Sequence, residues 1–394
     1  MSTYFKRKGG AVLIQMTNAP VNGLSHKVRL ALMQDLERAV SEKAPAVVLM
    51  GSGNHFSAGA DIAEFARGGH RTSPSLTDVI DYMDSYSTPL VAGIHGTALG
   101  GGLETALACH WRVANDSAIV GLPEVKLGIL PGAGGTQRLP RLTGVAAAVD
   151  IMTSGRMISP QEALSMGILD KLIASAKNQE ALADAVVDFA LSDTVQSTPI
   201  AQRRLSQLPV KGNDNGEEAF RILYDSVKKS AKGAVAPLSI LKAVQAAATY
   251  QSFPEGLKRE KEIFEELVKG PQSKALQYFF FSERRVSTLP ADVLANQPSA
   301  AVPPPAVVAK AAVVGGGKKD VMTISNIARV PTITSYPIAQ ILCVAFPSRV
   351  RLHRNHGSRH RDEFHQRGHP RHPLGGVARE GNRRAGRHRT DVQE

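Results

Sequence analysis

The stretch PLVAGIHGTALGGGLETALACHWRVAND, residues 89–116, decides the fold. Its apolar start predicts a buried strand, the glycines at 100–102 predict a turn, and the segment after them predicts a helix. Residues 111–116 then predict another strand. The same pattern of an apolar strand ending in glycines occurs earlier, at AVVLMGSG, residues 46–53. Strands therefore alternate with helices, which predicts the α/β class.

The flanking segments fit this class. Residues 11–16, AVLIQM, predict a strand, and Ser25 is expected to be the N-cap of the next helix. The apolar residues spaced for one face of that helix are Val28, Leu32, Met33, Leu36 and Val40. Further on, the SPQE sequence predicts a helix that begins with a capping box between Ser159 and Glu162 and ends at Gly167.

Strand signals stop after about residue 175, and helices are predicted at 217–230, 237–249, 255–269 and 272–283. The predicted organisation has four parts. Residues 1–195 form the catalytic core and 196–285 a C-terminal helical region, while 286–320 form a Pro/Ala-rich linker and 321–394 a basic, disordered tail.

Charge is unevenly distributed along the chain. The net charge is +12, but residues 348–394 contain twelve Arg, no Lys and five acidic residues, so the rest is only mildly basic. This distribution argues against a nucleic-acid partner. No apolar run reaches the roughly 20 residues of a membrane span, and no secretory signal is visible. Two cysteines provide no disulfide framework, which fits a reducing compartment.

The end of the chain is unusual in composition. Residues 348–394 hold seven of the twelve His but no repeated ligand spacing, so disorder is favoured over metal binding. We hypothesise that this stretch derives from an altered reading frame or splice event with loss of a domain, which sequencing of the transcript across residues 315–350 would test. The preceding AAVVGGG, 311–317, resembles the opening of a dinucleotide-binding unit, but it lacks the third glycine.

Two glycine-rich elements, HFSAGADI at 55–62 and HGTALGGGLE at 95–104, each follow an apolar strand. Glycine lets a ligand approach main-chain N–H groups closely, and a helix that begins near Gly101 directs free N–H groups outward. Two such groups aimed at one point can hold a thioester oxygen that gains negative charge. Taken singly, Glu104 is explained by a preference for helix N-termini, and Glu124 by solvation in a loop.

In combination, SAGADI, ALGGGLETAL and GLPEVKLGILPGAGGTQRLPRLTG (121–144) resemble the crotonase, or enoyl-CoA hydratase/isomerase, superfamily. Residues 4–285 are similar to the N-terminal half of peroxisomal-type bifunctional enzymes, which join this activity to a 3-hydroxyacyl-CoA dehydrogenase. The narrower likeness rests on APVNGLS near the start, SGRMISPQEALSMGILD (154–170) and KALQYFFFSER (274–284).

The resemblance implies a fold and a site. The fold is a spiral of ββα turns followed by a C-terminal helical region. The oxyanion hole is formed by the amides of Ala60 and Gly101, and the acid/base carboxylates are Glu104 and Glu124. The implied reactions are hydration of trans-2-enoyl-CoA to (3S)-hydroxyacyl-CoA and isomerisation of 3-enoyl-CoA, both in fatty acid β-oxidation. A non-catalytic CoA-thioester binder and another crotonase chemistry, such as thioester hydrolysis or C–C cleavage, remain alternatives.

The remaining expectations concern ligands and location. We expect an acyl-CoA substrate, no cofactor, no metal and no NAD-dependent activity. A peroxisome or glycosome-like organelle is implied by resemblance, with the cytoplasm as the alternative, and a homo-oligomer is left open. His95 and His110 could titrate near neutral pH, but together with His55 they are assigned structural or solvated roles. Cys109 and Trp111 are expected in the core.

Overall fold

The computed structural model describes residues 1–61, 64, 68–173, 176, 178–212, 216–287, 311–314 and 321–324. The chain divides into two compact units, Met1–Pro298 and Ser299–Glu394. The boundaries predicted near residues 195 and 285 both fall inside the first unit.

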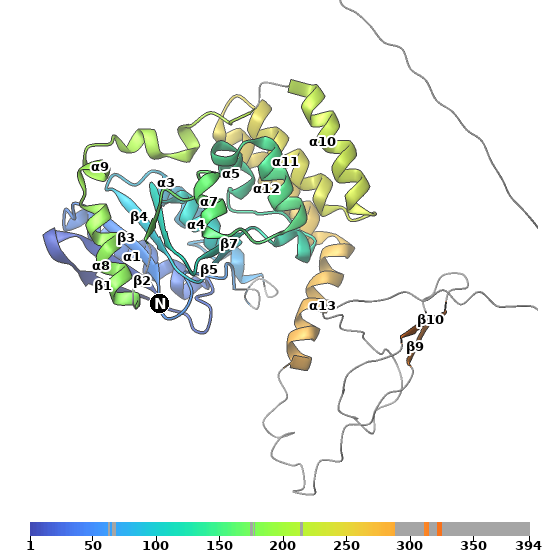
Figure 1. The fold of residues 1–394 in the computed structure, drawn as a ribbon, viewed down its shortest axis with the longest axis horizontal. Coiled ribbons are helices and arrows are strands. Elements are labelled where there is room, and N and C mark those ends of the chain that lie inside the picture. Colours follow the sequence, from blue (N-terminus) through green and yellow to red (C-terminus); the bar gives the residue numbers. More distant parts are fainter. Residues whose placement is uncertain are drawn as a thin grey trace, which may run out of the picture. The chain divides into compact units, whose positions relative to one another are not determined.

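The centre of the first unit is a six-stranded sheet (Figure 1). In spatial order its strands are β1 (Ser2–Lys6), β2 (Val12–Met16), β3 (Val47–Gly51), β4 (Leu90–Ile94), β6 (Trp111–Asn115) and β8 (Lys171–Ile173). β1 is antiparallel to β2, and every other neighbouring pair is parallel. Every residue of β3 and β4 is buried, as expected for parallel strands covered on both faces.

Helices cover the two faces of this sheet. On one face, Leu182, Val186 and Val187 of α8 (Gln179–Ala190) join a buried cluster with alternate side chains of β2 and β3. A larger cluster on the other face includes side chains of α1 (His26–Ser41), α3 (Leu76–Asp84) and α4 (Gly101–Ala108). The alternation of side chains along each strand therefore divides the core between two layers of helices.

A second, shorter ladder runs beside the main sheet. β5 (Thr97–Leu99) pairs in parallel with β7 (Ile119–Gly121), and isolated bridges extend the ladder from Ala98 to Ser57 and from Val120 to Ile158. Ser57, Ala98 and Val120 follow β3, β4 and β6 respectively, so each turn of the chain adds one strand to the main sheet and one rung to the ladder. This arrangement confirms the predicted ββα spiral.

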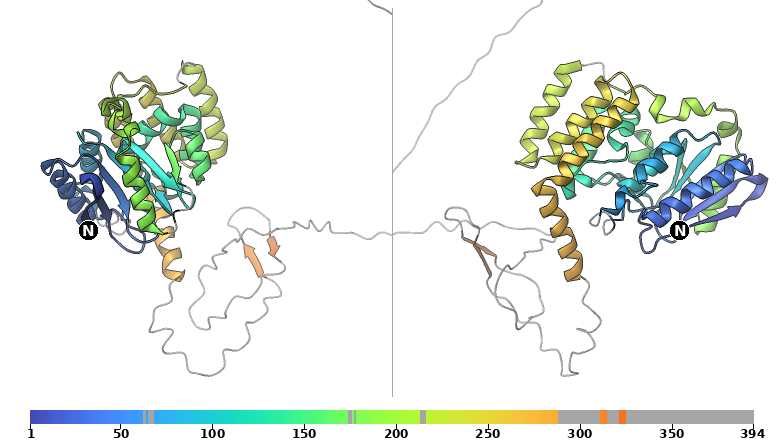
Figure 2. Two further views of the ribbon diagram at one scale, coloured as in Figure 1. Left: turned by 60° about the vertical axis from the view of Figure 1, so that its left-hand side comes forward. Right: turned by 180° about the vertical axis from the view of Figure 1, so that it is seen from behind.

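Helices follow the spiral. α5 (Gly135–Thr143), α6 (Val145–Ser154) and α7 (Pro160–Ser165) precede α8, and α9 (Asp193–Gln196) follows it. The four predicted C-terminal helices are α10 (Gly216–Ala231), α11 (Ala236–Thr249), α12 (Phe253–Lys269) and α13 (Pro271–Ser287). The short 3₁₀ segments are Lys8–Gly10, Gly69–Arg71, η3 (Glu124–Leu127), Ile200–Arg203 and Leu205–Gln207. α11 packs against α5, α6 and α12, and α13 lies against η3; Figure 2 gives two further views of these helices.

Three local expectations are corrected. Val40 is 38% exposed, and Ala39 is buried on α1 instead. The Ser159 side chain accepts a hydrogen bond from the Glu162 amide, but the Glu162 carboxylate accepts one from Arg156 at 2.7 Å, so the capping box is only half formed. After residue 175, the helices α8 and α9 are additional to the four that the sequence predicts.

In the second unit, β9 (Ala311–Val314) is formed by the apolar residues of AAVVGGG and pairs antiparallel with β10 (Val321–Ile324). The first residues of the segment predicted to be a disordered tail are therefore a strand, because they pair with β9. The other residues of the predicted linker beyond 287 and of the predicted tail lie outside the described residues. The hypothesis of an altered reading frame therefore concerns residues that the structure does not describe. Within the described part of the chain, no helix is both long enough and apolar enough to cross a membrane.

Candidate active site

The register of the short ladder brings Ala60 and Gly101 together. Ser57 and Ala98 form a parallel bridge, and each of the two amides lies three residues beyond its rung. A methyl group placed on Gly101 would lie 3.3 Å from the Ala60 nitrogen, and one placed on Gly59 would lie 3.1 Å from the Gly101 nitrogen. The two amides predicted to form an oxyanion hole are therefore neighbours.

Neither amide has a hydrogen-bond acceptor among the residues that the structure describes. Gly101 is the first residue of α4, so its N–H has no partner within the helix. The side chains of Leu24 and Leu76 adjoin Gly101, at 3.7 and 2.7 Å from a methyl group placed there. Apolar surroundings strengthen a hydrogen bond to an oxygen that gains charge.

Glycine is required on the approach to each amide. Gly59 has φ +100° and Gly100 has φ +54°, in the region that side chains rarely adopt. The Gly59 carbonyl accepts a hydrogen bond from the Leu24 amide at 2.9 Å, and the Gly100 carbonyl accepts one from the Glu104 amide at 2.9 Å. Each of these carbonyls lies in the same peptide plane as one of the two N–H groups, so the bonds fix the directions of those N–H groups.

Glu104 lies in the first turn of α4 and is 3% exposed. Its Oε1 accepts hydrogen bonds from the amides of Ala133 and Gly135, both at 2.8 Å. Its Oε2 accepts none from the described residues. Burial raises the pKa of Glu104, while the two amide donors and the Arg138 charge oppose this rise. The carboxylate is thus held by one oxygen and has the other free.

Glu124 is the first residue of η3, and its Oε1 lies 2.8 Å from a methyl group placed on Gly100. Its Oε2 is buried without a hydrogen-bond partner. Burial raises the pKa of Glu124 well above its ordinary value, and the charge of Glu104 raises it further. Two neighbouring carboxyl groups that repel each other in this way favour a state in which one holds a proton and the other does not.

A third buried carboxylate was missed from the sequence. Glu260 of α12 is 2% exposed and accepts hydrogen bonds from the Gly134 amide at 2.7 Å and the Thr136 amide at 3.1 Å. It occupies the buried face of α12 together with Gly256, Ile263 and Leu267. A glutamate at helical spacing within an apolar face is the sequence signal that could have identified it.

The histidines and Cys109 have structural surroundings. His110 accepts the Leu90 amide hydrogen at Nδ1, 3.0 Å away, and burial lowers its pKa to about 3. Burial also lowers the pKa of His95 below its ordinary value, so both pKa values move away from neutral pH. The core positions of Cys109, 1% exposed, and Trp111, 3% exposed, are confirmed.

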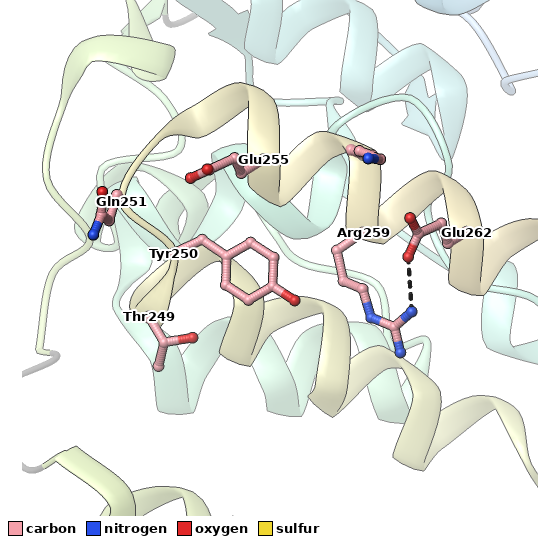
Figure 3. Close-up of a pocket in the computed structure, with 7 residues that line it drawn as sticks. Thr249, Tyr250, Gln251, Glu255, Arg259 and Glu262 are labelled. Carbon is pink, nitrogen blue, oxygen red and sulfur yellow. Dashed lines mark hydrogen bonds and ion pairs between the residues drawn. The ribbon is translucent and has the colours of Figure 1, made fainter.

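A surface hollow lies elsewhere, between the end of α11 and α12 (Figure 3). Tyr250 points into it, and Arg259 forms an ion pair with Glu262 at 2.9 Å along its edge. None of the four predicted site residues lines this hollow. In the described part of the chain, no cluster of three or more His, Cys, Asp or Glu side chains is arranged to hold a metal ion.

Comparisons with known proteins show a family for part of this chain. A model of the enoyl-CoA hydratase/isomerase family matches residues 6–199. The peroxisomal bifunctional enzyme of Danio rerio is 43% identical over 294 residues, covering 74% of this chain and 39% of that enzyme. The Homo sapiens enzyme of the same name is 41% identical over 289 residues, covering 73% of this chain and 39% of that enzyme.

The chain thus spans well under half the length of these relatives, over their N-terminal region. Among solved structures, an enoyl-CoA hydratase/isomerase from Pseudoalteromonas atlantica T6c has a TM-score of 0.52 at 23% identity, covering 72% of this chain and 97% of the other, which shows a shared fold. Residues 6–199 therefore form a domain of the enoyl-CoA hydratase/isomerase family.

Proposed function

We propose that this chain is an enoyl-CoA hydratase that adds water in syn fashion to trans-2-enoyl-CoA, forming (3S)-hydroxyacyl-CoA. We further propose that the same site isomerises 3-enoyl-CoA to 2-enoyl-CoA. The observation that carries the proposal is one juxtaposition. Two amides that have no acceptor among the described residues, those of Ala60 and Gly101, lie near the carboxyl groups of buried Glu104 and half-buried Glu124, and each carboxyl group has one oxygen without a donor among these residues.

The amides act on the thioester. The thioester carbonyl oxygen accepts hydrogen bonds from Ala60 and Gly101. As the water oxygen bonds to C3, the electron pair of the C2–C3 double bond moves toward the carbonyl and an enolate forms. The N–H donors are already oriented, so they stabilise this charge without reorganising during the reaction, which is worth about 100- to 1,000-fold per donor.

The carboxyl groups move the protons. Glu104 in its ionised form takes the proton of the attacking water, while protonated Glu124 gives its proton to C2 as the enolate collapses. Return of one proton from Glu104 to Glu124 restores the starting state. The raised pKa of Glu124, caused by burial and by the Glu104 charge, supports its role as the donor.

Isomerisation needs only one of these groups. Ionised Glu124 removes a proton from C2 of a 3-enoyl-CoA, and the same amides hold the resulting dienolate. Protonation at C4 by Glu124 then yields the 2-enoyl-CoA. The two reactions share a site because both develop negative charge on the thioester oxygen.

Substitution of the carboxylates tests the proposal. Glu104→Gln and Glu124→Gln should each lower kcat for hydration by at least about 100-fold, measured by the loss of absorbance of a conjugated 2-enoyl-CoA. Glu266→Gln, an exposed change on α12, serves as the control. Full activity in both site variants would reject the assignment. Binding without turnover in the wild type would indicate a CoA-thioester binder, and release of free thiol would indicate another crotonase chemistry.

The biological setting is also proposed. The name of the relatives from Danio rerio and Homo sapiens supports a peroxisomal setting, and the name of a Brassica napus relative, a glyoxysomal fatty acid beta-oxidation multifunctional protein, supports a role in fatty acid β-oxidation. The family model supports an acyl-CoA as substrate. Microscopy of the tagged chain would test the compartment. We propose that the chain has no dehydrogenase activity of its own, because Gly317 is followed by Lys318 and Lys319 and not by a complete nucleotide-binding fingerprint. Formation of NADH from a 3-hydroxyacyl-CoA and NAD would refute this.

A further inference from the structure

Glu104 and Glu260 share one loop. Four consecutive main-chain amides, from Ala133 to Thr136, donate alternately to the two carboxylates. The first and third, those of Ala133 and Gly135, donate to Glu104 at 2.8 Å each. The second and fourth, those of Gly134 and Thr136, donate to Glu260 at 2.7 and 3.1 Å.

This loop is the start of α5, whose first N–H groups have no partners within the helix. The two glutamates supply those partners from opposite directions in the sequence, since Glu104 belongs to α4 of the spiral and Glu260 to α12 of the helical region. Glu260 also accepts the Thr136 hydroxyl hydrogen at 2.5 Å, and the Thr136 hydroxyl in turn accepts a hydrogen bond from Gln137. All three donors to Glu260 are buried.

Alternation couples the two side chains mechanically. Successive peptide units are joined at a Cα atom, so displacement of the Cα atoms on either side of the Gly134 amide, away from Glu260, also displaces the Ala133 and Gly135 amides that hold Glu104. Gly134, at φ +94°, has no side chain to restrict its backbone, so this position is easy to distort once its hydrogen bond is lost. Misplacement of a catalytic group by about 1 Å can cost 100-fold in rate.

We propose that Glu260 is a positioning residue that fixes Glu104, through the loop from Ala133 to Thr136, in the orientation that presents its free oxygen to the attacking water. This inference rests on the proposed hydratase function. It gives α12 a part in the reaction although, in our mechanism, Glu260 touches neither the substrate nor the water. Burial raises the pKa of Glu104 and raises that of Glu260 to about 8, while the charge of Arg138, which is 1% exposed, opposes both shifts.

The test is a graded series at Glu260. Glu260→Gln keeps one acceptor oxygen for the loop, and Glu260→Met keeps the length of the side chain but has none. We expect kcat for hydration to fall about 3- to 10-fold in the first variant and about 100-fold in the second, with KM changed by less than about threefold. Glu266→Gln and Glu266→Met, exposed on the same helix, should leave kcat unchanged.

A second variant separates positioning from folding. Thr136→Val removes the hydroxyl that donates to Glu260 and accepts from Gln137, whose Nε2 keeps the Ala243 carbonyl as an acceptor, and should lower kcat by about threefold in the wild type but cause no further loss beside Glu260→Met. Hydration should also fall more than isomerisation in the Glu260 variants, because the proposed isomerisation uses Glu124 alone. A loss of folded protein would lower both reactions in the same proportion.

The outcomes distinguish this inference from the function on which it rests. If the wild type hydrates enoyl-CoA and both Glu260 variants retain kcat within about twofold, or lose both reactions equally, Glu260 is not a positioning residue. If the wild type does not hydrate enoyl-CoA, the proposed function fails first. Should Glu260→Met fail to fold, the Gln and Thr136→Val variants decide.

Discussion

At the scale of single residues, the proposed site depends on atoms that side chains would obstruct. Both oxyanion donors are main-chain amides, and a methyl group on Gly101 would lie 2.7 Å from the Leu76 side chain and 3.3 Å from the Ala60 nitrogen. Leu76 can move, because the contact is with the end of its side chain, but the Ala60 amide is main chain. The glycine therefore keeps the space in which a thioester oxygen would lie.

Gly101→Ala should thus impair catalysis more than stability. We expect kcat/KM for hydration to fall by at least about 10-fold, because the methyl group intrudes on the space between the two donors. Gly23→Ala is the control, since a methyl group there would meet nothing nearer than 3.6 Å. Steady-state kinetics and thermal unfolding of both variants would test this. Equal activity of the two would mean that the amides do not hold the substrate.

His110 should make stability depend on pH. Burial lowers its pKa to about 3 in the folded state, below its ordinary value of 6.5. The unfolded chain therefore binds more protons between these values, so this residue makes the protein less stable as pH falls below about 6.5, by up to about 1.4 kcal/mol per pH unit.

His110→Asn is the variant that tests this expectation, because Asn retains an acceptor for the Leu90 amide but cannot be protonated. Urea unfolding at pH 7 and pH 5 should show a smaller loss of stability on acidification than in the wild type. An identical pH dependence in both proteins would contradict the cause assigned here. Glu104 and Glu260 have raised pKa values, so their protonation increases the free energy of unfolding as pH falls through the same range. Both proteins contain these glutamates, so the difference between the two proteins reports on His110 alone.

At the scale of elements, the parallel register of the short ladder assembles the site. The rungs at Ser57, Ala98 and Val120 are aligned, so residues a few positions beyond each rung meet at one edge. Ala60 follows the first rung by three residues, Gly101 follows the second by three, and Glu124 follows the third by four. A shift by one residue in any rung would reverse the faces of the side chains and separate the amides.

α12 offers a test of local stability at the same scale. The Ser252 side chain accepts the Glu255 amide hydrogen, and the Glu255 side chain accepts the Ser252 amide hydrogen, so the capping box is complete. Ser252→Ala should lower the free energy of unfolding by about 1 kcal/mol. Ser25 occupies the same position on α1 without a side-chain cap bond, so Ser25→Ala should cost less than about 0.5 kcal/mol. Chemical unfolding would measure both, and the reverse order would contradict the role of the cap.

At the scale of the whole molecule, the first unit contains both core clusters and all four proposed site residues. A chain shortened to end at Pro298 should therefore fold cooperatively and hydrate enoyl-CoA within about twofold of the full chain. Circular dichroism and the hydration assay would test this. A shortened chain that unfolds, or that is inactive while the full chain is active, would show that later residues support the site.

The sequence by itself determined the repeated strand and glycine pattern and the four C-terminal helices, because local periodicity and the positions of Pro and Gly encode them directly. Family motifs in the sequence also led to the proposal of the two glutamates as catalytic residues. The sequence misplaced Val40 and half of one capping box, since tertiary contacts such as the Arg156–Glu162 hydrogen bond override local preference.

Only the tertiary structure decided which distant groups meet. The pairing of Ala60 with Gly101 depends on the register of a ladder across 41 positions of sequence between Ser57 and Ala98. The loop shared by Glu104 and Glu260 joins residues separated by more than 150 positions. Nothing in the sequence of α4 or of α12 indicates that the two glutamates bind the same loop. Such contacts form because buried amides and carboxylates must find partners within the packed core, and the chain fold alone determines which partners are within reach.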